Sequence, residues 1–389
     1  MSHIKKYAPR RRFEKFSNAD DWEQRKLGDH AKYRRGSFPQ PYGNKEWYDG
    51  EGAMPFVQVV DVTSKLTLVE NTKQKISKLA QPKSVFVPKG KVIVTLQGSI
   101  GRVAITQYDS FVDRTLLIFD DYEKETDERF WAYTIQKKFE IEKLKAPGGT
   151  IKTITKEALS SFDVHLPQFE EQQKIGILFK QLDDTIALHQ RKLEKIKALK
   201  TAYLSEMFPA EGETKPKRRF AGFTDDWEQR KLEDILDVRS GRDYKHLDSG
   251  DIPVYGTGGH MLSVGEALSY EEDAIGIGRK GTIDKPYILK APFWTVDTLF
   301  YTVPKRDSDL NFIHSIFQKI NWKSKDESTG VPSLSKTTIN AVSVFTPSCS
   351  EQKEIGTFFN KLDDTIALHQ RKLQKLQNIK KAYLNEMFI

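Results

Sequence analysis

The sequence has a single cysteine, Cys349, among its 389 residues. One cysteine excludes an internal disulfide and a cysteine-based zinc site, and it fits a reducing, cytoplasmic setting. No apolar run approaches the roughly eighteen residues that a membrane span requires. The basic N-terminal residues 1–12 have no apolar core after them, so they are not read as a signal peptide. We therefore expect a cytoplasmic chain that does not bind a membrane.

Motifs that carry catalysis or metal binding are also missing. We find no G-x-x-x-x-G-K-[ST] phosphate loop, no strand-linked G-x-G-x-x-G and no Asn-Pro-Pro-aromatic motif, and the histidines lack H-x-x-x-H spacing. The triplet Glu213-Thr-Lys215 has letters of a nuclease motif but lies in a polar linker. We predict no catalytic residue, no metal site and no cofactor in this chain. An enzyme with an unfamiliar site stays as an alternative.

Positive charge is in excess. The chain has 62 lysines and arginines against 54 aspartates and glutamates, a formal net charge of +8. A surplus of this size favours a polyanionic partner, with nucleic acid as the first candidate.

Two internal repeats define the domain organisation. The segment Asp20–Leu27 recurs letter for letter at Asp225–Leu232. The segment Glu171–Phe208 recurs with changes at Glu351–Phe388, and Leu182–Leu193 within it is identical to Leu362–Leu373. The two repeats have different offsets, because the segments that they bracket, roughly 27–167 and 232–347, differ in length and in most of their sequence. The chain therefore alternates variable and constant parts, as a common frame that presents two different surfaces would.

The constant parts have the pattern of long helices. Apolar residues recur at near-heptad spacing, without an internal proline, over about 37 residues or roughly 55 Å. The stripe of the first copy includes Ile175, Phe179, Leu182, Ile186, His189, Leu193, Ile196, Leu199 and Tyr203, and that of the second includes Ile355, Phe359, Leu362, Ile366, His369, Leu373, Leu376 and Tyr383. A helix this long needs a partner for its stripe, so we predict that the two copies pair as an antiparallel intramolecular coiled coil.

The polar residues within the helices are predicted to have structural roles and no catalytic one. His189 and His369 are predicted to set the register of the pair, because neither has a carboxylate or a second histidine at helical spacing. The pairs Asp183-Asp184 and Asp363-Asp364 are assigned to the solvated face.

The variable parts are predicted to be compact α+β domains. Strands are expected at 57–62, 92–96, 274–277 and 342–345, and shorter helices at 127–143 and 311–320. The predicted organisation is a basic N-terminal segment (1–21), a first domain (22–169), a first helical spacer (170–208), a linker (209–226), a second domain (227–347) and a second spacer (348–389).

One short segment links the two domains and indicates a binding surface. Leu96-Gln-Gly-Ser-Ile-Gly101 aligns in pattern with Arg279-Lys-Gly-Thr-Ile-Asp284, and each follows an apolar strand. Glycine turns let a backbone approach a ligand closely, and hydroxyl, lysine and arginine side chains beside them suit phosphates and base edges. The predicted DNA-contacting residues are Arg34, Arg35, Ser37, Tyr42, Gln97, Ser99, Arg102, Arg114, Lys152 and Thr153 in the first domain, and Arg239, Arg242, Tyr244, Arg279, Lys280, Thr282, Ser333 and Ser335 in the second. For any single loop, an ordinary β-turn with solvated charges is the alternative.

This architecture resembles the specificity subunit of type I restriction-modification systems. The resemblance covers nearly the whole chain and rests on the repeated Trp-Glu-Gln-Arg-Lys-Leu entries (22–27 and 227–232), the glycine turn after a strand, the lead Leu166-Pro167 with Glu171-Gln172, and the Leu-Asp-Asp-Thr-Ile blocks. In the second copy the lead is Thr346-Pro347, a small departure.

The resemblance implies that each variable domain reads one half of a split double-stranded DNA target. It further implies that the helices set the spacing and dock two methyltransferase subunits, and that two motor-nuclease subunits join the full complex. S-adenosylmethionine, ATP and magnesium would then belong to those partners. The helix residues assigned to spacing and docking are Leu182, Ile186, His189, Leu193, Leu362, Ile366, His369 and Leu373.

Because the two variable segments differ, the two half-sites are predicted to differ, which gives a non-palindromic target. The main alternative is a coiled-coil scaffold that binds proteins through two adaptor domains.

Overall fold

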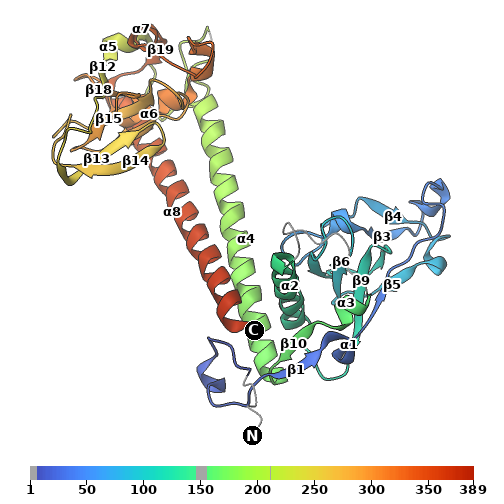
Figure 1. The fold of residues 1–389 in the computed structure, drawn as a ribbon. Coiled ribbons are helices and arrows are strands. Elements are labelled where there is room, and N and C mark those ends of the chain that lie inside the picture. Colours follow the sequence, from blue (N-terminus) through green and yellow to red (C-terminus); the bar gives the residue numbers. More distant parts are fainter. Residues whose placement is uncertain (1–6, 146–155, 211) are drawn as a thin grey trace. The chain divides into compact units, whose positions relative to one another are not determined.

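The computed structural model describes residues 7–145, 156–210 and 212–389. The chain divides into two compact units, one made of Met1–His189 with Leu373–Ile389 and one made of Gln190–Lys372. The first unit therefore combines two stretches that are far apart in the sequence, whereas the second is continuous. Each unit is described here by itself (Figure 1).

Two four-stranded sheets form the first variable domain. One has the order β2 (Ala31–Arg35), β9 (Leu116–Tyr122), β6 (Val92–Thr95) and β7 (Val103–Ile105). The other has the order β4 (Gln74–Ile76), β3 (Met54–Val57), β8 (Ser110–Val112) and β5 (Val85–Val87), with β3 and β8 parallel. Helix α2 (Glu128–Lys145) contacts β6 and β7. All four residues of β6, Val-Ile-Val-Thr, are β-branched and buried, so the strand shows no alternation of apolar and charged residues.

The second variable domain repeats this plan. Its larger sheet has the order β12 (Leu236–Ser240), β18 (Leu299–Pro304), β15 (Ala274–Gly278) and β16 (Tyr287–Leu289). Its smaller sheet has the order β14 (Gly259–Val264), β13 (Ser249–Gly256) and β17 (Trp294–Thr295), and β13 pairs parallel with β17 as β3 does with β8. Helix α6 (Leu310–Lys319) corresponds to α2. The prediction that the two domains share one α+β fold is confirmed.

The repeated Trp-Glu-Gln-Arg-Lys-Leu entries form the same ribbon in both domains. Strand β1 (Glu23–Lys26) pairs antiparallel with β10 (Asp163–Leu166), and β11 (Glu228–Lys231) pairs in the same register with β19 (Ser343–Thr346). The short helices α1 (Leu27–His30) and α5 (Leu232–Ile235) follow directly, and α3 (Lys156–Ser160) and α7 (Lys336–Asn340) precede the return strands.

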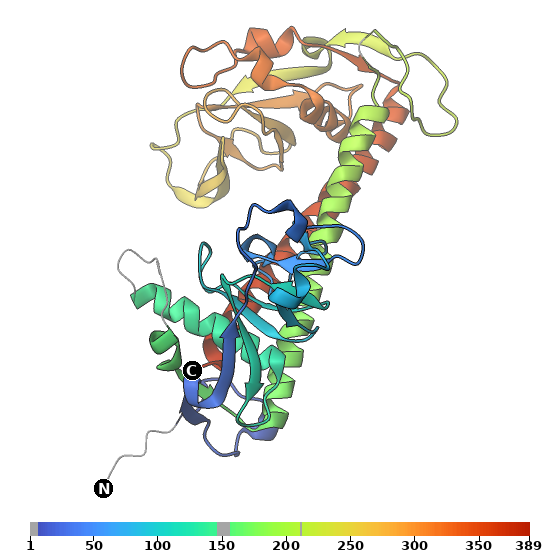
Figure 2. The same ribbon diagram turned by 90° about the vertical axis from the view of Figure 1, so that its right-hand side faces the viewer.

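The predicted long helices are α4 (Phe169–Glu206, 38 residues) and α8 (Cys349–Met387, 39 residues). In the first unit the early part of α4 pairs with the end of α8, where the Lys380 ammonium lies 2.5 Å from the Asp183 carboxylate. In the second unit the end of α4 pairs with the early part of α8, where Lys200 forms the corresponding ion pair with Asp363. Both pairings are antiparallel, as predicted, and the segments run side by side in both views (Figures 1 and 2).

Two details of the helix prediction are wrong. Asp183 and Asp363 are not on the solvated face, because each forms an ion pair across the helix pair. Leu199 is not in the buried stripe, since 40% of it is exposed. Both errors arise because a heptad pattern fixes the buried stripe only to within about one residue around the helix.

Both helices contain a glycine where a neighbouring helix crosses closely. A Cβ atom on Gly176 would lie 2.5 Å from a carboxylate oxygen of Asp127, and one on Gly356 would lie 2.2 Å from that of Asp309. These aspartates precede α2 and α6. The buried Gln352 completes the junction, since its side chain accepts from the Asp309 amide and donates to a backbone carbonyl of the preceding loop. Glycine is therefore required by packing at this point.

The ends of the long helices close the cores of the variable domains. In the first unit, Phe388 after α8 stacks on Phe130 of α2 and contacts Phe179 of α4, with ring centroids 5.6 and 5.5 Å apart. In the second unit, Phe208 after α4 occupies the same place against Phe312 and Phe359. Each variable domain is thus sealed by the end of one long helix and the start of the other.

Arginines that precede each Trp-Glu-Gln-Arg-Lys-Leu segment form ion pairs with glutamates at the ends of the long helices. Arg12 donates two hydrogen bonds, of 2.7 and 2.8 Å, to the buried carboxylate of Glu171, and Arg219 does the same to Glu351 at 2.6 and 2.7 Å. The preceding arginines, Arg11 and Arg218, pair with Glu386 and Glu206. The segment 1–21 and the linker therefore form equivalent arginine–glutamate ion pairs with the long helices. The repeated Arg-Arg-Phe triplet, at 11–13 and 218–220, was the sequence signal for them.

Most predicted secondary structure in the domains is confirmed, with one exception. The strand expected at 57–62 ends at Val57, and Val59–Asp61 forms a 3-10 turn. The buried Asp61 carboxylate accepts from the amides of Gln58 and Lys73, which stabilises the turn against the β-branched propensity of the valines. None of the described helices is both long and apolar enough to span a membrane.

Candidate nucleic-acid interface

Loops at one edge of the second domain are joined by backbone hydrogen bonds. The loop after β15 pairs with the loop before α7, since the Gly281 amide donates to the Pro332 carbonyl at 2.8 Å and the Leu334 amide donates to the Arg279 carbonyl at 2.9 Å. The Arg279 amide also donates to Thr298, in the turn between β17 and β18. The segments 279–282, 330–335 and 296–298, which are separated in the sequence, therefore form one continuous surface.

This surface contains several of the predicted DNA-contacting residues. Arg279 and Lys280 are exposed, and Thr282 and Ser333 are half-buried beside them. The Arg279 guanidinium lies over the Phe300 ring, 5.7 Å from its centroid, and this contact restricts its orientation. Arg242 is exposed on a neighbouring loop, and its amide donates to Thr295 at 2.9 Å. Tyr244 is half-buried in the core cluster of the smaller sheet, which fits the core alternative for that residue.

Two predicted residues of the second domain have partners within the protein. Arg239 forms ion pairs of 2.7 Å with Glu272 and Asp237, and these carboxylates raise its pKa. Its charge is thus balanced locally. The Ser335 hydroxyl accepts from the Thr338 amide at 3.0 Å and so caps α7. Both side chains have evident structural roles, which the sequence pattern did not reveal.

The first domain has the same surface with different residues. The Leu96 amide donates to the Thr115 carbonyl at 2.8 Å, as Arg279 does to Thr298, so the aligned segments 96–101 and 279–284 are structurally equivalent. Gly98 and Gly281 both have positive φ, +64° and +96°, which glycine adopts without steric cost. Gln97 of this turn is exposed and Ser99 is half-buried.

A second glycine pair explains why the loops after β2 and β12 match. A Cβ atom on Gly36 would lie 2.1 and 2.4 Å from the carbonyl oxygens of Val112 and Asp113, and one on Gly241 would lie 2.6 and 2.0 Å from those of the equivalent Thr295 and Val296. The neighbouring residues Arg35 and Arg242 are exposed. Ser37 is half-buried, and its hydroxyl lies 3.4 Å from the Lys83 carbonyl.

The other predicted residues of the first domain vary in their surroundings. Arg34 pairs with Asp120 at 2.8 Å, and Arg102 is exposed with one contact to the Val62 carbonyl. Arg114 is exposed and lies over the Tyr42 ring, 5.1 Å from its centroid. Lys152 and Thr153 lie outside the described residues.

Tyr42 is a supporting residue beneath Arg114. Its ring stacks on Phe38 with centroids 5.1 Å apart, and its hydroxyl donates to the buried carboxylate of Asp113. Burial and this hydrogen bond raise the pKa of Tyr42, so the phenol remains a donor. The same carboxylate accepts from the Thr115 amide at 2.9 Å. A buried network thus fixes the turn that carries Arg114.

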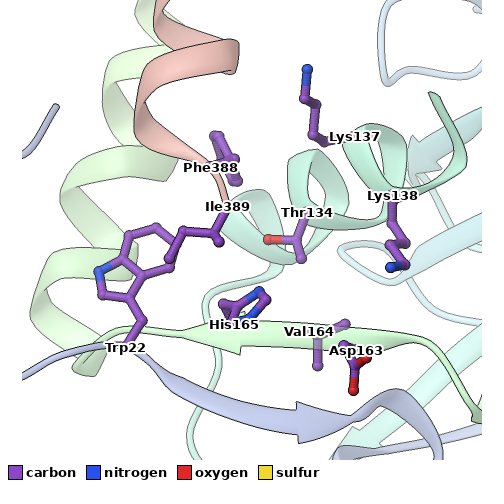
Figure 3. A pocket seen from close by; sticks show the side chains of 9 residues that line it. All are labelled: Trp22, Thr134, Lys137, Lys138, Asp163, Val164, His165, Phe388 and Ile389. Atoms are coloured by element: carbon purple, nitrogen blue, oxygen red, sulfur yellow. The ribbon is translucent and has the colours of Figure 1, made fainter. Parts of the chain in front are cut away.

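A hollow in the first unit lies beside the end of α8. It lies where Phe388 and Ile389 meet α2 and β10 (Figure 3). Asp163 on its rim pairs with Lys26, and the Lys137 ammonium contacts Asn385. A hollow occurs at the matching helix end of the second unit, beside Phe208. Both are parts of the helix-end junctions. Within residues 7–145, 156–210 and 212–389, no cluster of His, Cys, Asp or Glu could hold a metal ion.

The chain matches the family model described as the type I restriction modification DNA specificity domain over residues 19–198 and 224–378. The chain belongs to this family, so the resemblance is confirmed. Its curated relatives include two Methanocaldococcus jannaschii proteins. The MjaVIII type I restriction enzyme specificity subunit is 22% identical over 232 residues, 59% of this chain and 52% of that protein. The putative MjaX specificity subunit is 26% identical over 186 residues, 46% of this chain and 41% of that protein.

The matched region thus spans about half the length of these curated relatives or less. A solved structure supports the fold over nearly the whole chain. The S subunit of a type I restriction-modification system from M. genitalium superposes with a TM-score of 0.71 at 18% identity, covering 98% of this chain and 99% of that one. Specificity domains of this family are in general not catalytic.

Proposed function

We propose that this chain is the DNA sequence-recognition subunit of a type I restriction-modification complex and that each variable domain reads one half of a split, asymmetric target. The observation that carries this proposal is the duplicated loop surface. The same hydrogen-bonded framework occurs in both domains and presents Gln97, Ser99 and Arg114 in one, but Lys280, Thr282 and Asp297 in the other. A constant frame with different exposed side chains suits the reading of two different sequences.

The partners follow from the same assignment. Two methyltransferase subunits would supply S-adenosylmethionine-dependent methylation of adenine, and two motor-nuclease subunits would use ATP and magnesium in the cytoplasm. This chain would provide recognition and spacing alone. The scaffold alternative is not favoured, because the family is defined by DNA specificity and the loop surfaces are basic.

The decisive experiment is to co-express the chain with a methyltransferase subunit and map the methylated adenines. We expect a split, asymmetric motif that appears only with this chain, and replacement of residues 27–167 by those of another family member should change one half alone. DNA binding by the complex should weaken by about a thousandfold between 50 and 200 mM salt if about six phosphates are neutralised. Methylation that does not depend on the chain, without DNA binding at low salt, would instead support the scaffold.

The docking of methyltransferase subunits is assigned to exposed leucines of the spacer helices. Of the eight stripe residues proposed for spacing and docking, Leu193 and Leu373 are buried and the other six are half-buried, which suits the spacing role. By contrast, Leu188 of α4 is 50% exposed, and its counterpart in the identical repeat, Leu368 of α8, is 44% exposed. An exposed leucine thus occurs at the same position of both repeats, which suits two copies of one partner.

The double variant Leu188→Glu, Leu368→Glu should therefore bind methyltransferase subunits at least about tenfold more weakly, because a charge replaces an apolar anchor. Co-purification and calorimetric titration would measure this. The control is Glu194→Ala with Gln374→Ala, which changes exposed residues elsewhere around the helices. Unchanged assembly of the leucine variant would place the docking surface on other residues.

A further inference from the structure

One β-turn has the same structure in both variable domains but carries opposite charges. It follows β8 in the first domain, at 113–116, and β17 in the second, at 296–299. The exposed residue at the second position of the turn is Arg114 in one and Asp297 in the other.

The equivalence of the two positions rests on five matching backbone hydrogen bonds. In the first domain the donor and acceptor residues are Leu116–Asp113, Asp113–Val57, Leu96–Thr115, Gly36–Leu116 and Ser37–Val112, at 2.8–3.1 Å. In the second domain they are Leu299–Val296, Val296–Tyr255, Arg279–Thr298, Gly241–Leu299 and Arg242–Thr295, also at 2.8–3.1 Å. The backbone therefore presents Arg114 and Asp297 in the same way relative to its own sheets and glycine loops.

Each turn is held by its surroundings. Arg114 lies over the Tyr42 ring, and the Asp113 carboxylate holds both the Tyr42 hydroxyl and the Thr115 amide. Beside Asp297, the Arg279 guanidinium lies over Phe300 and reaches the Asp297 carbonyl at 3.4 Å. These contacts hold the Arg114 and Arg279 side chains before binding, which favours selective over adaptable contacts.

The opposite charges of Arg114 and Asp297 help to decide whether this position contacts a phosphate or a base edge. A phosphate contact would require a donor in both domains, and a carboxylate at that point would be repelled by the DNA backbone. Base edges differ, because guanine offers the acceptors O6 and N7 to arginine, whereas cytosine offers its N4 amino group as a donor to aspartate. An arginine and an aspartate at one structural position are thus both compatible with a base edge, but not both with a phosphate.

We propose that this turn position determines one base pair of each half-site. Arg114 reads a guanine in the half bound by the first domain, and Asp297 reads a cytosine in the half bound by the second. This inference rests on the proposed function and adds to it the residue and the base class that it selects.

The test uses the complex with methyltransferase subunits and the target mapped for the wild-type chain. The variants Arg114→Asp and Asp297→Arg are compared separately, and Arg114→Gln and Asp297→Asn provide milder changes of similar shape. Each variant should lose about tenfold to a hundredfold in binding to the original target and should lose or change the preference at a single base pair, in one half only. The control is Arg10→Asp, which makes the same charge change at an exposed residue outside the variable domain.

The outcomes distinguish a failure of the proposed recognition function from a failure of the proposed base contact at the turn. If the wild-type complex yields no split motif, the proposed function itself fails. If a split motif is found but the four variants leave both halves unchanged, or weaken binding equally for all sequences, the turn contacts no base edge and this inference is overturned. Thermal unfolding of each variant checks that a loss of binding does not come from a loss of structure.

Discussion

The variant Phe388→Ala is expected to lower the free energy of unfolding of the first unit by about 3–5 kcal/mol. Phe388 is 7% exposed and belongs to the main core of that unit, where it stacks on Phe130 with an interplanar angle of 16°. Removal of its ring leaves a cavity at the point where the end of α8 closes the first domain. Hydrogen exchange of the β6 amides should report the loss, while the amides of β15 in the second unit serve as the reference.

Ile389→Ala is the matched control, because this neighbouring side chain is 41% exposed and its truncation should cost under about 0.5 kcal/mol. Unchanged protection of β6 in Phe388→Ala would mean that the end of α8 does not support the first domain.

The variant Gly356→Ala is expected to destabilise the second unit by about 2–4 kcal/mol, although alanine is the better helix former. The added Cβ atom would lie 2.2 Å from the Asp309 carboxylate and 2.7 Å from the Phe312 amide. Asp309 caps α6 by accepting from that amide at 2.9 Å, so the crowding also disturbs the cap. Chemical denaturation would measure the loss.

Gly258→Ala is the control, since a Cβ atom there meets nothing within 4 Å. A Gly356→Ala protein as stable as the wild type would show that α6 and α8 can separate slightly at their crossing without cost.

The periodic parts of the fold were predictable, because their signal is carried by many residues at once. The stripes of α4 and α8, and buried β-branched strands such as Val92–Thr95, each repeat one physical requirement several times. The 3-10 turn at Val59–Asp61 was not predicted, because a single buried carboxylate determines it. The choice of partners across the helix pair, such as Lys380 with Asp183, depends on an alignment that the repeat alone does not give.

The structural equivalence of the candidate loops was predictable, but the surroundings of their individual side chains were not. The aligned turns at 96–101 and 279–284 predicted two structurally equivalent loops, since a glycine turn leaves a pattern in the sequence. Arg239 and Arg279 look alike in sequence, yet one is neutralised by two carboxylates and the other is exposed. The positive net charge of the chain gives no signal for Asp297, although the tripeptides at 114–116 and 297–299 share their last two letters, Thr-Leu.

The way the first unit is assembled determines the order in which the two units are completed during synthesis. Residues 190–372 form the second unit from one continuous stretch, whereas the first unit needs Leu373–Ile389. Domains generally fold as units during synthesis, and the N-terminal one is usually completed first. Here the first domain to leave the ribosome is closed only after the second unit has been synthesised, because Phe388 follows residues 190–372 in the sequence.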